Sequence, residues 1–198
     1  TLTVAALGQA TAETKVIHLK PDGTGDYPTL EAALAEAPPG ATIMLAAGKY
    51  VQSKTLVVTR STKLVGAGAH LTEIIVTTPD DGLRVFITGH FAASGIAFRR
   101  TGEAKSDLVK VFAMTVEIAD CWFVSEAQPT AADNAAGLHI GGVTKGTVKG
   151  CTASGNSGIG ILVEGSAQVN LQDNVCSNNK LAGIAFRVSS SGSANRNL

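Results

Sequence analysis

Residues 137–188 read GLHIGGVTKGTVKGCTASGNSGIGILVEGSAQVNLQDNVCSNNKLAGIAFRV and contain a repeating unit. The repeat is a short strand-like motif that occurs five times along the chain, at 83–86 (LRVF), 109–112 (VKVF), 138–141 (LHIG), 159–162 (IGIL) and 184–187 (IAFR). Successive copies are 21 to 29 residues apart. A repeat of this length indicates a solenoid, because each unit can bury its apolar side only against a neighbouring unit.

A second short motif repeats in step with the first. It occurs at 93–96 (ASGI), 118–121 (IADC), 148–151 (VKGC) and 171–174 (LQDN), with spacings of 25, 30 and 23 residues. Two series in step, joined by turns rich in Gly, Asn and Ser, predict an all-β fold, a right-handed parallel β-helix. A leucine-rich repeat is excluded because its Leu and Asn positions are not filled here.

Alternation along the first motif predicts which side chains face the core, since successive residues of a strand point to opposite faces. The first and third residues are apolar in every copy and are expected to point inward: Leu83, Val85, Val109, Val111, Leu138, Ile140, Ile159, Ile161, Ile184 and Phe186. The second residues are expected to face outward: Arg84, Lys110, His139, Gly160 and Ala185.

One helix is expected before the coils. Thr29 is a suitable N-cap for a helix over residues 30–37, Glu31 favours its first turn, and residues 38–40 (PPG) end it. Such a helix would cap the open end of the solenoid. We expect residues 16–198 to form one domain, with coils over about 42–198 and a C-terminal end that is truncated or associates end to end with another copy.

Composition excludes several kinds of partner. The chain has 198 residues, with 16 basic and 16 acidic side chains and few aromatics, which argues against nucleic acid. It contains no run of about 18 apolar residues, so no membrane insertion is expected. Residues 1–15 are expected to be a leader or linker, and their small, mildly apolar start could be the tail of a secretory signal. We therefore expect a secreted or extracytoplasmic protein.

Cysteine and asparagine residues are expected to be structural. Cys121 and Cys151 occupy the same position of the second motif, which favours stacked interior thiols over metal ligands and leaves a disulfide between successive coils open. Several asparagines are expected to cap corners or to stack in a ladder: Asn156, Asn174, Asn178 and Asn179.

The first half of the chain resembles the pectin methylesterases of the pectin-lyase-like superfamily, over about residues 18–125. The resemblance rests on 22–30 (DGTGDYPTL), 47–50 (AGKY), 64–68 (LVGAG), 91–102 (FAASGIAFRRTG) and 121–124 (CWFV). It implies the β-helix fold and a polysaccharide as the ligand class.

The catalytic residues of that family are not matched. Where the family has a Gln-Asp pair, residues 124–128 read VSEAQ, and where it has Asp-Phe-Ile-Phe-Gly, residues 147–152 read TVKGCT. Its Gly-Arg-Pro-Trp segment is absent. The sequence therefore favours a non-catalytic module that binds a polysaccharide or serves as a structural or sensing domain. The alternative is a polysaccharide lyase, esterase or hydrolase acting on an acidic polysaccharide such as pectin, with other catalytic residues.

The outward row Arg84, Lys110 and His139 is the first candidate binding site. Coils stack about 4.8 Å apart, so these side chains would form a row roughly 10 Å long, which could hold the carboxylates of an acidic polysaccharide. The alternative is a solvated face that carries charge for solubility.

Two further residues are candidates for substrate binding. Arg99, with Glu126 and the insertion 124–136, could form one wall of a cleft, and Trp122 is a single aromatic that could stack on a sugar. No cofactor is expected. A Ca²⁺ site is a weaker alternative, for which the available carboxylates are Asp80, Asp81, Glu117, Asp120 and Asp133.

Overall fold

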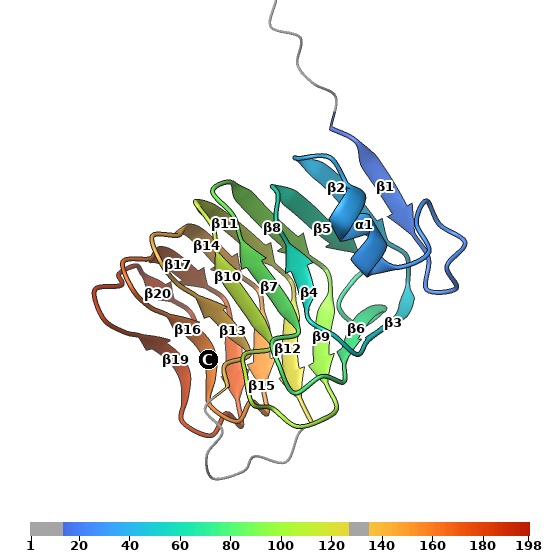
Figure 1. Ribbon diagram of the computed structural model, residues 1–198. Helices are drawn as coiled ribbons and strands as arrows, with labels where there is room; N and C mark the ends of the chain where they lie inside the picture. The colour runs from blue at the N-terminus through green and yellow to red at the C-terminus, as the bar shows by residue number, and fades with distance from the viewer. Residues whose placement is uncertain (1–13, 127–134) are drawn as a thin grey trace, which may run out of the picture.

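Short parallel strands wind around a single apolar core in the computed structural model, which describes residues 14–126 and 135–198 (Figure 1). Nearly all of the expected leader, and most of the insertion 124–136, lie outside the described residues. Every strand pairs in parallel with its equivalent in the coil before or after it, which confirms the parallel β-helix.

The strands form three sheets, here named A, B and C. Sheet A has eight strands: β1 (Val16–Leu19), β2 (Ala41–Leu45), β5 (Thr62–Gly66), β8 (His90–Ser94), β11 (Thr115–Ala119), β14 (Lys145–Lys149), β17 (Gln168–Gln172) and β20 (Ala194–Asn195). Sheet B has six strands: β3 (Gly48–Gln52), β6 (Thr72–Val76), β9 (Ala97–Arg100), β12 (Trp122–Ser125), β15 (Thr152–Ser154) and β18 (Val175–Ser177). Sheet C also has six strands: β4 (Leu56–Val58), β7 (Leu83–Phe86), β10 (Val109–Phe112), β13 (Leu138–Ile140), β16 (Ile159–Val163) and β19 (Ala182–Phe186).

The first repeat series lies in sheet C, and its predicted register is correct except in β16. Lys110 lies opposite both Arg84 and His139 as expected. His139, however, pairs with Leu162 and not with Gly160. Residues 159 and 161–163 are all apolar, so two registers that differ by two residues satisfy the same alternation. The predicted register of β16 was therefore wrong by two residues, and Ile161, not Ile159, lies opposite Leu138.

The second series is in the predicted register along sheet A. Ile118 lies opposite both Ala93 and Val148, and Val148 lies opposite Leu171. Two residues further along, the chain turns a corner through the left-handed region in four successive coils: Gly95, Asp120, Gly150 and Asp173 have φ between 52° and 65°. This repeated corner explains why Gly and Asp alternate at the position, since both tolerate positive φ.

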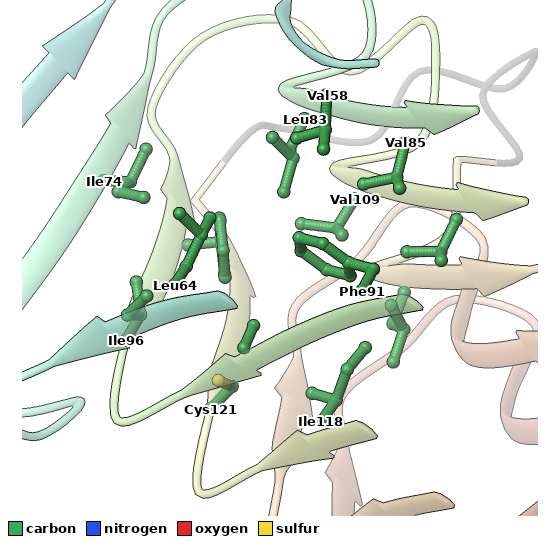
Figure 2. Close-up of a cluster of buried hydrophobic side chains, with 14 of the residues drawn as sticks. Val58, Leu64, Ile74, Leu83, Val85, Phe91, Ile96, Val109, Ile118 and Cys121 are labelled. Carbon is green, nitrogen blue, oxygen red and sulfur yellow. The ribbon is translucent and has the colours of Figure 1, made fainter. Parts of the chain in front are cut away.

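The core consists of stacked apolar columns from the three sheets (Figure 2). Val85, Val109 and Val111 of sheet C are buried, as the alternation predicted, and so is Ile118 of sheet A. Ile184 and Phe186 in the last coil are only partly buried. Between β9 and β12, Phe98 and Phe123 stack with ring centroids 5.7 Å apart.

The predicted helix forms at the start of the solenoid as α1 (Leu30–Glu36). Thr29 is its N-cap, where the hydroxyl accepts a 3.1 Å hydrogen bond from the Ala32 N–H. The buried face of α1 packs against β4, the first strand of sheet C, and so covers that edge. Arg60 donates to the Ala35 and Ala37 carbonyls at the other end of the helix. No helix in the described part of the chain is long and apolar enough to cross a membrane.

Cysteine and asparagine side chains stack inside the coils, as the sequence indicated. Cys121 and Cys151 are buried, and no disulfide joins the three cysteines, all of which lie in the described residues. Asn174 continues this position in the next coil, where it accepts from the Cys151 N–H at 2.9 Å and donates to the Val148 carbonyl at 3.0 Å. Asn156 and Asn179 form a second ladder at another corner, with a 2.9 Å bond between their amides.

Candidate functional site

The predicted site residues divide between two sheets. Arg84, Lys110 and His139, here called the charged row, lie side by side on the outer face of sheet C. Arg99 and Trp122 lie on β9 and β12 of sheet B and do not join the row. The structure therefore brings together three of the five predicted binding residues, and the other two lie on a different sheet.

Two aspartates complete the charged row, each three residues before its basic partner. Asp81, in the turn before β7, accepts a 2.8 Å hydrogen bond from Arg84 Nε. Asp107, in the equivalent turn before β10, lies 3.0 Å from Lys110 Nζ, which is also 3.9 Å from Asp81 Oδ1. Sequence analysis missed both partners. The available signal was an aspartate three residues before a basic residue in two successive coils.

His139 points outward from sheet C but is buried, with 6% of its surface exposed, so the prediction of a solvated side chain was wrong. Its Nδ1 lies 2.7 Å from Asp107 Oδ2. On the other edge of the ring, Nε2 lies 3.0 Å from Glu164 Oε1. That second contact lacks hydrogen-bond alignment, so Nε2 has no hydrogen-bond partner among the described residues. Two carboxylates and the edge of Phe112 cover the imidazole.

The Asp107 carboxylate is held in its ionised form. Burial raises its pKa, but hydrogen bonds from His139, the Ala136 N–H and Lys110, together with the charge of His139, outweigh burial and lower the pKa below its ordinary value. The bond from the Ala136 N–H to Oδ1 is 2.8 Å long. An ionised Asp107 can only accept, so His139 Nδ1 carries the proton in this contact.

Arg100, the last residue of β9, is 1% exposed and contacts the turns that precede β7 and β10. Its guanidinium donates to the Ser106 and Asp80 carbonyls at 2.5 Å and to the Asp107 carbonyl at 3.3 Å. Burial lowers the pKa of this guanidinium, and the charges of Asp81, Asp107 and Asp80 oppose that effect. Arg100 therefore joins the two turns that carry the acidic residues.

Two phenylalanines, one exposed and one half-buried, border the charged row on the same face of sheet C. Phe86 and Phe112, here called the phenylalanine shelf, stack with centroids 4.8 Å apart and rings 6° from parallel. Phe86 is 53% exposed, and the Phe112 ring meets His139 edge-on at a centroid distance of 5.5 Å. The sequence signal for the shelf was the aromatic fourth residue of the motifs at 83–86 and 109–112, which the alternation directs outward.

The sheet B candidates form a smaller polar group. Arg99 Nη1 lies 2.5 Å from Glu126 Oε1, so two residues expected to share one wall are neighbours, and Arg99 Nε lies 3.8 Å from Glu73. Trp122 is half-buried on the outer face of the same sheet. The insertion expected to build a wall beside Arg99 lies mostly outside the described residues, as does Asp133.

The described residues bring together no group of three or more His, Cys, Asp or Glu side chains arranged to hold a metal ion. Glu117 lies on β11 and Asp120 at the following corner, in sheet A, whereas Asp81 belongs to the charged row. The carboxylates considered for Ca²⁺ are thus distributed over separate parts of the coil.

The fold and its repeated coils define a class of protein, and the family comparison agrees. The family model described as right handed beta helix region matches residues 92–198, which is more than half of the chain. The chain therefore belongs to that family of right-handed β-helices.

Comparison with individual proteins adds only the fold. No curated protein sequence matches the chain. Among solved structures, ORF18 of Geobacillus virus E2 is similar, with a TM-score of 0.61 and 12% sequence identity. The match covers 91% of this chain and 40% of the viral protein, so the chain spans less than half the length of that neighbour.

Proposed function

We propose that this β-helix is a non-catalytic module that binds a polysaccharide across the outer face of sheet C. The observation that carries the proposal is the phenylalanine shelf, with its exposed Phe86 ring, directly beside the charged row. A sugar ring has apolar C–H faces and a rim of hydroxyls. An aromatic surface next to charged hydrogen-bonding groups suits both parts of such a ligand.

Charge pairing within the row bears on which polysaccharide it takes. Asp81, Asp107 and Glu164 neutralise the basic groups, so a ligand carboxylate meets few uncompensated cations. Arg84 is the most exposed of the basic side chains in the row and is the natural contact for a uronate. With Arg84 as the contact for its carboxylates, an acidic polysaccharide such as pectin is the first ligand class that we propose, and hydroxyl contacts and stacking supply most of its binding. Such polymers occur outside the cell membrane, and we also propose an extracytoplasmic location.

A glycan-array screen of the purified chain, with pectin, alginate and neutral polysaccharides, tests this proposal. We expect binding to at least one acidic polymer, with an affinity that falls only modestly between low and physiological salt, because the cations are already paired. Failure to bind any polysaccharide would contradict the proposal and would leave a structural or sensing role.

The charged row also favours a second candidate, a carbohydrate-active enzyme. Asp107 and Glu164 contact opposite edges of the His139 imidazole, so two carboxylates and a histidine, side chains commonly used in general acid–base catalysis, lie together on this face. In that case Asp107 and Glu164 would be the acid–base pair. Turnover of an array hit is measured as new reducing ends, as absorbance from unsaturated products, or as released methanol.

Glu164→Gln is the variant that tests this second candidate, and Glu117→Gln on sheet A is its matched control. A wild-type activity that Glu164→Gln abolishes and Glu117→Gln retains would establish the enzyme. Binding without any product would support the non-catalytic module.

A further inference from the structure

An open pocket of about 280 Å³ borders the phenylalanine shelf, at the corner where sheet C turns toward sheet A. Three successive coils contribute to it, and its lining includes Ile87, Phe112, Met114, Gly142 and Val143. Phe112 therefore belongs both to this pocket and to the shelf, so the two surfaces are continuous.

The pocket is apolar and open to solvent. Met114 is 61% exposed and Val143 is 71% exposed, so two large apolar side chains stand at its rim. Gly141 is part of the lining, and a Cβ at this position would lie 2.6 Å from Phe112 Cζ. The glycine thus leaves room for the phenylalanine ring.

The polar atoms of Thr144, which also lines the pocket, are already used within the coil. Its hydroxyl donates to the Gly141 carbonyl at 2.7 Å and accepts from the Ala113 N–H at 3.0 Å. Thr88, the other hydroxyl of the lining, is exposed to solvent. A ligand hydroxyl placed beside Thr144 would lose its hydrogen bonds to water without gaining equivalent ones. The lining therefore selects against an unsubstituted sugar ring and for an apolar group.

We propose that this pocket binds an apolar ester substituent, an acetyl or methyl group, on the polysaccharide that lies across the shelf. The inference rests on the proposed function, because the shelf holds the sugar to which the substituent is attached. Phe112 packs between Phe86 and Gly141, so the exposed Phe86 ring is the one on which a sugar can stack. A sugar in that position lies beside Phe112 and presents its substituents to the adjoining pocket. Acetyl and methyl groups are small enough to enter without any change in the coils.

The test compares each polysaccharide that binds in the array with its chemically O-acetylated form, which has the same number of carboxylates. We expect the acetylated form to bind roughly tenfold more tightly, as burial of an acetyl group predicts. The double variant Met114→Ser/Val143→Ser should remove this difference and leave binding of the unacetylated form unchanged. Val51→Ser, which replaces an exposed valine on sheet B, is the matched control and should retain the difference.

The outcomes separate this inference from the proposed function. Equal affinity for the two forms would overturn the apolar subsite and leave polysaccharide binding intact. Binding of neither form would overturn both. Dimerisation of the wild type, detected by sedimentation and lost in the double variant, would assign the pocket to a second copy of the chain and would also overturn the subsite.

Discussion

Arg100 is the residue on which the geometry of the charged row depends most. Its buried guanidinium bonds to carbonyls in both acidic turns and lies near three aspartates. We expect Arg100→Met to lower the free energy of unfolding by about 3 kcal/mol, because it leaves three backbone carbonyls without their donor and removes a buried positive charge near three aspartates. Urea titration measures this loss.

Arg99→Met is the matched control for that variant. Arg99 is the preceding residue, and its ion pairs lie at the surface of sheet B, so we expect a loss below about 1 kcal/mol. Equal losses in the two variants would show that Arg100 does not support the acidic turns.

Asp107 should make the stability of the folded protein depend on pH in the acidic range. Because its pKa is lower in the folded chain than in the unfolded chain, its stabilising contribution is complete above the ordinary aspartate pKa of about 4. That contribution is lost as the pH falls from about 4 through the lower folded value. We expect the melting temperature of the wild type to fall more steeply below pH 4 than that of Asp107→Asn.

Glu103→Gln is the control for the acid dependence, since Glu103 is an exposed carboxylate in a surface ion pair with Lys105. It should melt with the same pH profile as the wild type. An unchanged profile in Asp107→Asn would contradict the proposed ionisation of Asp107 in the folded protein.

At the residue scale, alternation predicted direction correctly but did not predict exposure. The pattern LRVF directed Arg84 outward, and the structure confirms this direction. It directed His139 outward as well, yet Asp107 and Glu164 cover that ring. Both acids lie in turns, outside the strands. The alternation of a strand does not apply to turn residues, so it could not predict where these side chains point.

The asparagine ladders are the elements that hold successive corners together. Asn174 is fully buried, and it satisfies the Cys151 N–H and the Val148 carbonyl in the preceding coil. We expect Asn174→Ala to cost about 2–4 kcal/mol in the free energy of unfolding, because both backbone groups are left buried without a partner. Thermal and urea unfolding measure this loss.

Asn170→Ala provides the comparison for the ladder. Asn170 is exposed on β17, where its side-chain oxygen accepts from Ser193 alone among the contacts described for it. We expect a much smaller loss of stability. Equal losses of unfolding free energy in the two variants would show that the buried ladder stabilises the coils no more than an exposed asparagine does.

Strand pairing was predictable wherever apolar and polar residues alternate without interruption. Sheet A met this condition at Ile118, Val148 and Leu171, and its register was predicted correctly. Strand β16 did not, because apolar residues on both of its faces allow a shift of two residues. The small cluster of Ala136, Ile159 and Leu162 outside the main core shows where the additional apolar residues pack.

Over the whole molecule, the reactivity of the three cysteine thiols measures whether the coils are folded. Burial raises the pKa of Cys151 to about 12 and that of Cys176 to about 11, and it raises the pKa of Cys121 as well. Thiolate is therefore scarce at pH 8, and the buried Cys121 and Cys151 should react with an aromatic disulfide reagent only as fast as the protein unfolds. The partly exposed Cys176 should react slowly in the native protein. In urea, three thiols should react at once, whereas fewer than three would reveal a disulfide between coils.

The solenoid was predictable from two short motifs because the same alternation of apolar and polar residues recurs in every coil. A wrong register in one coil, such as that of β16, therefore does not change the predicted fold. The functional face was only partly predictable. Its charged row follows from strand register, whereas Asp81, Asp107 and the apolar pocket are products of turns at two different corners.

The most direct test of polysaccharide binding on sheet C is a calorimetric titration of the tightest array ligand into the wild type and Phe86→Ser, with Val51→Ser as control. Phe86 and Val51 are both exposed apolar residues, so neither change should alter folding. We predict that Phe86→Ser weakens binding tenfold or more, through loss of stacking, and that Val51→Ser binds like the wild type. Equal affinity in all three proteins would contradict the account, because the polysaccharide would then bind elsewhere.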